Sequence, residues 1–222
     1  MRRWSRGRIA AWAAIVGALA AANYAVRFSG SSSSAANERD ALYHYSSAVS
    51  GLIFYALFFA FVYAVAAVDT DELFALRRPR SIRGAVGYGF AAIAGVYVVS
   101  AALSPFLNAG KEQGLTPSHW EPSHAGAYAA NFVVVALVAP VVEELTFRGV
   151  GYGLLEQYGR PLAIVVVGIA FGLAHGLVEA LPVLAAFGML LTWLRAKTDS
   201  VIPGMIVHAL FNSIALVAAV TT

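Results

Sequence analysis

Six polar side chains fall in apolar surroundings in the second half of the sequence. In chain order they are Glu143, Glu144, Arg148, His175, His208 and Asn212. An ionised side chain at the centre of a bilayer costs ~2.5–3.5 kcal/mol on insertion scales, so residues kept there are functional candidates. The same charges at the end of a membrane helix cost almost nothing. The chemistry open to these residues therefore depends on how deep they lie.

Helical spacing separates two roles within the glutamate pair. Arg148 is four residues after Glu144, and this order of charges favours a helical ion pair. Glu143 points about 100° around the helix from Glu144, and its own neighbour four residues on is Phe147. The spacing predicts that Glu144 and Arg148 give structural support, and that Glu143 is the chemical base.

The depth of Glu143 can be compared with that of His175. A break at Gly159 separates their two helices, and each residue lies 16 positions from Gly159. At 1.5 Å per residue both would be roughly 24 Å from the turn, at one level in the bundle. His208 and Asn212 are four residues apart, so they share one helix face. These positions predict one polar cavity inside the membrane, lined by all four side chains.

Such a cavity suits peptide hydrolysis, which needs an activated water and a stabilised oxyanion. A carboxylate in surroundings of low dielectric is a better base than one in water. Glu143 fits that task, with His175 orienting the water or sharing its proton. Donors placed at the developing oxyanion lower the barrier by several kcal/mol. The Asn212 amide and the His208 ring can both donate.

Zinc is the alternative activator of the water. His175, His208 and one glutamate would make a two-histidine, one-carboxylate set with an open coordination position. The sequence lacks the His-Glu-x-x-His spacing of helical zinc sites. Asn212 is a poor zinc ligand but a good oxyanion donor. We therefore expect no metal cofactor, with zinc as the competing interpretation.

The elements that must position these residues are membrane helices. The 222 residues are 59% hydrophobic and 12% charged, whereas a soluble domain usually has about a quarter charged residues. The absence of cysteine excludes disulfides and a cysteine nucleophile. Seven stretches without Asp, Glu, Lys or Arg have about the length of a membrane span: Ile9–Val26, Ala41–Val68, Gly84–Gly110, Pro122–Val142, Pro161–Val178, Ala180–Leu194 and Val201–Thr222. We predict an all-α, polytopic transmembrane bundle of about seven helices, whose short sixth helix could be tilted or re-entrant.

Basic residues predict how the chain crosses the membrane. Placed on alternating loops, the 15 basic residues divide 12 to 3, and the poorer side has only Arg27, Arg39 and Lys111. Cytoplasmic loops are enriched in basic residues, so we predict a multi-pass cell-membrane protein with a cytoplasmic amino terminus. The formal charge of +3 then reflects topology and anionic lipid headgroups, and we expect no nucleic-acid binding. The first segment also fits a cleaved signal peptide, although its apolar run is long for one.

Taken together, the polar patterns resemble the CAAX prenyl protease type II and bacteriocin-processing family (CPBP). The family pattern is Glu-Glu-x-x-x-Arg, then Phe-x-x-x-His, then His-x-x-x-Asn. The sequence has all three in order, as Glu143, Glu144 and Arg148, then Phe171 and His175, then His208 and Asn212. The resemblance covers about residues 126–220. We divide the chain into variable amino-terminal membrane helices, residues 1–125, and a CPBP-like catalytic core, residues 126–222, within one integrated membrane domain.

The resemblance implies an all-helical intramembrane endopeptidase that acts on a membrane-associated or lipid-modified peptide or protein. The roles it implies are water activation by Glu143 and His175, oxyanion stabilisation by His208 and Asn212, and support by Glu144, Arg148 and Phe171. Two other uses of the cavity stay open. One is a non-catalytic scaffold for a hydrophobic partner. The other is a proton-coupled transporter, although the sequence shows none of the repeated, broken-helix halves that transporters often have.

Overall fold

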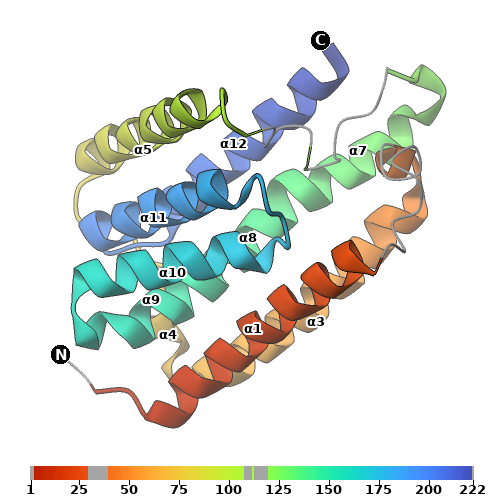
Figure 1. Cartoon of the computed structure of the whole chain (residues 1–222). Helices are drawn as coiled ribbons and strands as arrows, with labels where there is room; N and C mark the ends of the chain where they lie inside the picture. Colours follow the sequence, from red (N-terminus) through yellow and green to blue (C-terminus); the bar gives the residue numbers. More distant parts are fainter. Residues whose placement is uncertain (1–2, 30–39, 108–111, 113–119, 222) are drawn as a thin grey trace.

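The structure is a computed structural model that describes residues 3–29, 40–107, 112 and 120–221. Every regular element in these described ranges is a helix, as predicted. The hairpin of α10 (Arg160–Ala174) and α11 (Leu181–Thr198) lies between α1 (Arg6–Phe28) and α5 (Ile82–Leu103), as Figure 1 shows.

The remaining elements complete a helical bundle around this hairpin. The other α-helices are α3 (Tyr45–Ala66), α4 (Thr70–Phe74), α7 (Ala125–Val133), α8 (Ala139–Glu144), α9 (Tyr152–Leu155) and α12 (Ile202–Thr221). Short 3₁₀ segments lie at Asp40–Tyr43, Ala67–Asp69, Pro122–His124 and Glu156–Tyr158. Two π-helical segments, Val134–Val138 and Leu145–Gly151, join α7, α8 and α9 into one long helical element.

Five helices of the described chain are long and apolar enough to cross a membrane, judged by length and composition. They are Arg6–Phe28, Tyr45–Phe74, Ile82–Leu103, Pro122–Tyr158 and Ile202–Thr221. The other two predicted spans form the central hairpin. Its α10 has only 15 residues, and α11 ends with Arg195 and Lys197 in its last turn. The all-helical, multi-span fold is therefore confirmed, with two of the predicted spans forming a pair of shorter helices.

Backbone packs against backbone inside the hairpin. A Cβ atom at Gly168 would lie 2.7 Å from the Met189 nitrogen, and one at Gly188 would lie 2.7 Å from the Gly168 oxygen. Both distances are shorter than a real Cβ atom tolerates, so a larger residue at either position would push the helices apart. Small residues allow membrane helices to approach closely. Here they fix the position of α10, whose C-cap residue is His175.

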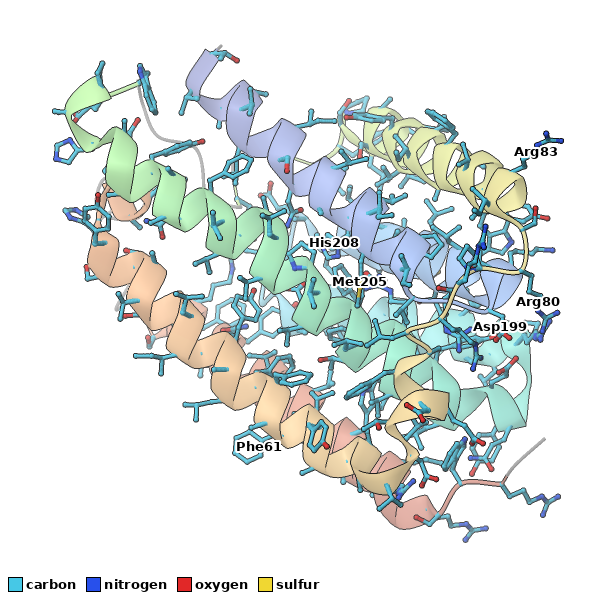
Figure 2. The ribbon with its side chains drawn as sticks, turned by 180° about the vertical axis from the view of Figure 1, so that it is seen from behind. Phe61, Arg80, Arg83, Asp199, Met205 and His208 are labelled. Carbon is cyan, nitrogen blue, oxygen red and sulfur yellow. The ribbon has the colours of Figure 1, made fainter. Side chains whose placement is uncertain are left out.

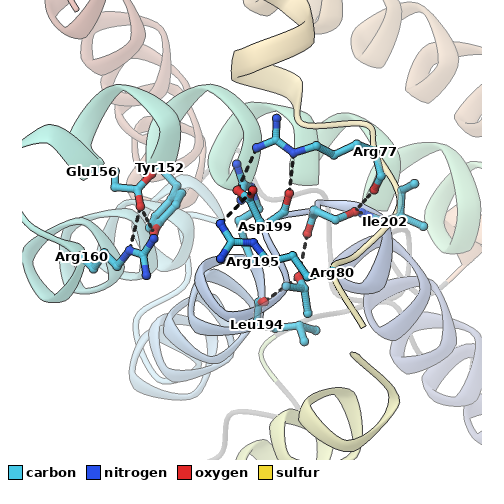
Figure 3. A network of polar contacts seen from close by, with 11 residues as sticks. Arg77, Arg80, Tyr152, Glu156, Arg160, Leu194, Arg195, Asp199 and Ile202 are labelled. Carbon is cyan, nitrogen blue, oxygen red and sulfur yellow. Dashed lines mark hydrogen bonds and ion pairs between the residues drawn. The ribbon is translucent and has the colours of Figure 1, made fainter. Parts of the chain in front are cut away.

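One end of the bundle, which we name the basic end, collects ion pairs. It is defined by Arg8, Asp69, Arg77, Arg80, Glu156, Arg160, Arg195 and Asp199. In Figure 3, Asp199 is the centre of the largest group. Its Oδ1 lies 2.8 Å from Arg77 and 3.1 Å from Arg195, and its Oδ2 lies 3.3 Å from Arg80. These arginines all belong to the side that the sequence predicts to be cytoplasmic.

Candidate active site

A cavity of about 440 Å³ lies between α3, α8, the α10–α11 hairpin and α12. The polar side chains on its wall are Tyr55, Glu143, His175, His208 and Asn212, and the rest of the lining is apolar. The structure thus brings together all four residues that the sequence nominated for chemistry. Their catalytic roles stay a prediction.

Behind the cavity, Glu144 and Arg148 form the predicted ion pair, with 2.9 Å between Oε1 and Nη1. Both side chains are 0% exposed. Arg148 also donates from Nη2 to the Gly188 carbonyl at 3.2 Å, and its Cζ lies 4.3 Å from the centre of the Phe171 ring. A charge inside a protein is tolerated only when it is paired and hydrogen-bonded. The pair is therefore part of the structure that holds the cavity wall.

His208 connects this ion pair to the cavity. Its Nδ1 lies 3.1 Å from Glu144 Oε1, and its Nε2 faces Glu143 Oε2 at 3.7 Å. Because an ionised carboxylate only accepts hydrogen bonds, Nδ1 must be the donor of the first contact. The ring also packs edge-on against Phe171 and Phe187. The Nε2 atom is therefore the one left for chemistry inside the cavity (His208 is labelled in Figure 2).

Glu143 is held by a residue that lies outside the three motifs. The Tyr55 hydroxyl, from α3, donates to Glu143 Oε1 at 2.9 Å. The side chain of Glu143 is 14% exposed, whereas that of Glu144 is fully buried. The two neighbouring glutamates thus have different surroundings, and Glu143 Oε2 is the carboxylate oxygen nearest to the His208 ring nitrogen that faces the cavity.

His175 ends α10 with one ring nitrogen already occupied. Its Nδ1 lies 2.7 Å from the Phe171 carbonyl oxygen, and the two rings are 4.6 Å apart between centroids. A carbonyl oxygen accepts hydrogen bonds, so Nδ1 carries the proton. In the neutral ring, Nε2 is then the acceptor. Phe171 therefore sets both the tautomer and the orientation of His175.

The loop after His175 is fastened by α1. Asn23 donates from Nδ2 to the Ala174 carbonyl at 2.7 Å, and the Tyr24 hydroxyl donates to the Leu177 carbonyl at 2.9 Å. Gly176 has a φ of 66°, and a Cβ atom there would lie 2.6 Å from Asn23 Cβ. A residue with a side chain fits neither the dihedral angle nor the space.

A carboxylate from the segment between α5 and α7 holds the same loop. Glu112 accepts from the backbone nitrogens of Val178 at 2.9 Å and Ala180 at 2.7 Å, and it forms an ion pair with Arg27 at the end of α1. We name these contacts the outer clasp. They tie the tip of the hairpin, close to His175, to two other parts of the chain.

Each π-helical segment receives a hydrogen bond from another helix. Asn212 donates from Nδ2 to the Val135 carbonyl at 2.9 Å. Trp12 donates from Nε1 to the Thr146 carbonyl at 3.0 Å. π-helical turns inside α-helices are frequent at functional sites. Here they flank Glu143 on both sides along the chain. Asn212 keeps its second amide hydrogen and its oxygen for other partners.

Several of these contacts could not be found in the sequence. Tyr55, Asn23 and Glu112 lie in the part of the chain without motifs, and they meet the site only through tertiary packing. A tyrosine within an apolar span is a weak signal, because Tyr63 on the same helix is half-exposed. In the sequence, Glu112 lies next to Lys111, and such a pair of charges is typical of an ordinary loop.

Zinc stays the competing interpretation of this arrangement of side chains. Among the residues that the structure describes, no three His, Asp or Glu side chains are grouped so as to hold a metal ion. His208 Nδ1 is bonded to Glu144, and His175 Nδ1 faces a carbonyl oxygen. A histidine that binds zinc through one ring nitrogen usually makes such a contact with the other, so chelation is the test that decides between the two interpretations.

The fold and the site define a class: a multi-pass helical membrane protein with a glutamate, two histidines and an asparagine around one cavity. Residues 125–214 match the family described as Type II CAAX prenyl endopeptidase Rce1-like. This region is less than half of the chain, but it contains all three motifs. The resemblance is therefore confirmed for this region, and the match implies a protease acting on a peptide or protein at a membrane. Comparison with curated proteins and with solved structures gives no match.

Proposed function

We propose that this protein is an intramembrane endopeptidase in which Glu143 is the general base for hydrolysis of a peptide bond. The observation that carries the proposal is the shared cavity of Glu143, His175, His208 and Asn212 within the region that matches the protease family. A scaffold or a transporter needs no oxyanion donors opposite a base. Peptide hydrolysis needs both.

Water activation follows from the hydrogen bonds already made. Tyr55 occupies Glu143 Oε1 and leaves Oε2 for a water molecule. His175, protonated at Nδ1 by its contact with the Phe171 carbonyl, can accept from the same water through Nε2. A water that donates to both groups directs its lone pair at the scissile carbonyl carbon. Glu143 takes the proton as the new C–O bond forms, and then delivers it to the nitrogen of the leaving amine.

The oxyanion of the tetrahedral intermediate is stabilised from the α12 side. Asn212 donates through the amide hydrogen that is not directed at the Val135 carbonyl. His208 donates through Nε2, which requires a proton on both ring nitrogens because Nδ1–H points at Glu144. The carboxylates of Glu143 and Glu144 flank that ring, at 3.7 Å from Nε2 and 3.1 Å from Nδ1. Donors fixed before the reaction typically lower such a barrier by about 3–4 kcal/mol each.

Replacing Glu143 by glutamine tests this role, since the amide keeps the shape and cannot accept the proton. Membranes from cells that produce the wild type or Glu143→Gln would be compared by mass spectrometry of protein termini. We expect at least one terminus that the wild type generates and the variant does not. Asp71→Asn, the same change at an exposed carboxylate outside the cavity, should leave that terminus in place.

Two results would count against the proposal. One is an identical set of termini for wild type and Glu143→Gln when both accumulate as folded protein. The other is loss of the terminus in Asp71→Asn as well, which would attribute the effect to altered production of the protein rather than to the base.

A further inference from the structure

The apolar stretch of α1 has few side chains that can donate a hydrogen bond, and all of them bond to the elements that carry the site. Within Ile9–Val26 the sequence contains three such side chains, namely Trp12, Asn23 and Tyr24. Each donates to a backbone carbonyl, either of the segment that follows Glu143 or of the backbone on one side of His175. A polar group in a membrane helix is costly unless it is bonded. The placement of these three donors therefore indicates a specific task for α1 at the site.

Trp12 holds the segment that follows Glu143. Its Nε1 donates to the Thr146 carbonyl at 3.0 Å, and a Cβ atom at Gly151 would lie 2.6 Å from Trp12 Cζ2. Gly151 is five residues after Thr146, which is the spacing of a π-helical turn, so the indole covers one such turn. The Thr146 hydroxyl in turn donates to the Val142 carbonyl at 2.7 Å. Trp12 is thus connected through one residue to the backbone directly before the proposed base.

Asn23 and Tyr24 hold the backbone on both sides of His175. Asn23 donates at 2.7 Å to the carbonyl of Ala174, the last residue of α10. Carbonyls in the last turn of a helix have no partner within that helix. The Tyr24 hydroxyl donates at 2.9 Å to the Leu177 carbonyl. His175 therefore lies between two carbonyls that α1 keeps in place.

One face of α1 makes both sets of contacts. Trp12 and Asn23 are 11 positions apart, so at 100° and 1.5 Å per residue they lie within roughly 20° of each other and roughly 16 Å apart along the axis. Between them, Val16 is 5% exposed and Leu19 packs against the core. The helix packs against α10 and against the π segment Leu145–Gly151. A helix that is bonded to two elements in this way fixes the distance between them.

We propose that α1 is a positioning helix of the active site, which holds Glu143 and His175 in the relative placement that lets both side chains bind one water molecule. The catalytic meaning of this inference rests on the proposed peptidase function, whereas the fixed placement of His175 does not. In the part of the chain that the structure describes, none of the three donors of α1 lines the cavity. They act through the two catalytic side chains and not on the substrate. α1 also lies outside residues 125–214, which match the protease family.

Removing the donors one at a time tests this role in the purified, full-length protein in liposomes, with the peptide that spans the bond found by comparing termini. Asn23→Leu and Trp12→Phe should each lower kcat about tenfold, and Tyr24→Phe, which loses a single oxygen atom, should lower it a few-fold. KM should stay unchanged, because misplaced catalytic groups slow the chemical step without weakening binding. Tyr158→Phe, at an exposed tyrosine, is the matched control and should keep the wild-type kcat.

A spectroscopic readout makes the test independent of cleavage. NMR of protein labelled with ¹⁵N in its five histidines reports which ring nitrogen carries the proton, and His175→Asn identifies the signals of that residue. In the wild type we expect one form of His175 with its proton on Nδ1, which faces the Phe171 carbonyl. Asn23→Leu and Tyr24→Phe should show both tautomers, while the signals of His44, at the start of α3, should not change.

Three results in folded variants would each overturn the inference: a wild-type kcat, a change confined to KM, or unchanged His175 signals. If Asn23→Leu does not fold, Tyr24→Phe decides the matter. Absence of cleavage by the wild type would contradict the peptidase function, and the His175 signals alone would then decide whether α1 fixes that ring. A purified protein whose mass shows that residues 1–28 have been removed would also overturn the inference, because α1 would then be absent.

Discussion

The basic end and the surroundings of the cavity use charge in opposite ways. At the basic end, Asp199 is 36% exposed and shares three arginines, so water and neighbouring side chains can replace any one contact. Behind the cavity, Glu144 and Arg148 are 0% exposed and depend on each other. Exposed ion pairs contribute little to stability, whereas a buried charge that loses its partner is strongly destabilising. The comparison indicates that the few ion pairs buried inside the bundle affect its stability more than the many exposed ion pairs at the basic end.

The largest effect on stability is expected from breaking the buried pair. Arg148→Leu leaves the Glu144 carboxylate without its counter-ion, and such a loss typically costs about 3–5 kcal/mol. Unfolding of the purified protein in mixed micelles should show a decrease of this size. Adding Glu144→Gln should restore part of the stability, because the carboxylate that lost its counter-ion is then replaced by a neutral amide. Equal stability of Arg148→Leu and the wild type would contradict the comparison.

The next effect concerns activity rather than stability. Tyr55→Phe removes the hydrogen bond that fixes Glu143 Oε1, and a lost bond to a charged group is worth about 1.5 kcal/mol or more. We expect the cleavage rate to fall about tenfold with little change in unfolding. Tyr63→Phe, on the same helix, is the matched control and should keep full activity. A rate unchanged by Tyr55→Phe would show that Glu143 needs no such support.

The outer clasp should have a smaller effect on activity. Glu112→Gln loses its ion pair with Arg27 but can still accept a backbone hydrogen bond on the hairpin tip. We expect the cleavage rate to fall a few-fold as His175 becomes less well fixed. Arg27→Gln should act similarly, and the double variant should be little worse than either single one. Fully additive losses would indicate that the two residues do not act through one contact.

The smallest effect is expected at the basic end. Burial raises the pKa of Asp199, but hydrogen bonds from Arg77 and Arg195 outweigh it, and the pKa lies below its ordinary value of 3.8. A carboxylate whose pKa is lowered by folding stabilises the protein above that ordinary value, and the contribution is lost as the pH falls further. Asp199→Asn should therefore cost about 0.5–1 kcal/mol near neutral pH.

The pH dependence supplies the control for that variant. The difference in unfolding free energy between the wild type and Asp199→Asn should shrink as the pH drops below about 4. A difference that stays constant through this range would mean that Asp199 acts by packing and not by its charge.

Helical periodicity predicted the parts of the site that lie on single helices. The spacing of Glu144 and Arg148 indicated their ion pair, and equal distances from Gly159 placed Glu143 and His175 at one level. Contacts between distant helices have no such signal. Tyr55 reaches Glu143 across 88 positions of sequence, and only the packing of α3 against α8 creates the contact.

The fold was predictable as a class but not in its details. Counting uncharged residues extended the fifth predicted span to Val178, whereas α10 ends at Ala174 because the backbone turns at His175 and Gly176. A search for stretches without charged residues cannot distinguish uncharged loop residues from the helix that precedes them. The two π segments were also unpredictable, since an apolar run gives no sign of where a helical turn widens.

The account depends most on Glu143 as the group that takes the proton from water. Its most direct test is the rate at which purified wild type and Glu143→Gln, reconstituted in liposomes, cleave a peptide that spans the bond found by comparing termini. We predict cleavage by the wild type with or without a zinc chelator, and a loss of at least 100-fold in Glu143→Gln, in line with general-base catalysis. Cleavage by Glu143→Gln at the wild-type rate would contradict the mechanism, and loss of wild-type activity on chelation, restored by zinc, would replace it with the metal-dependent one.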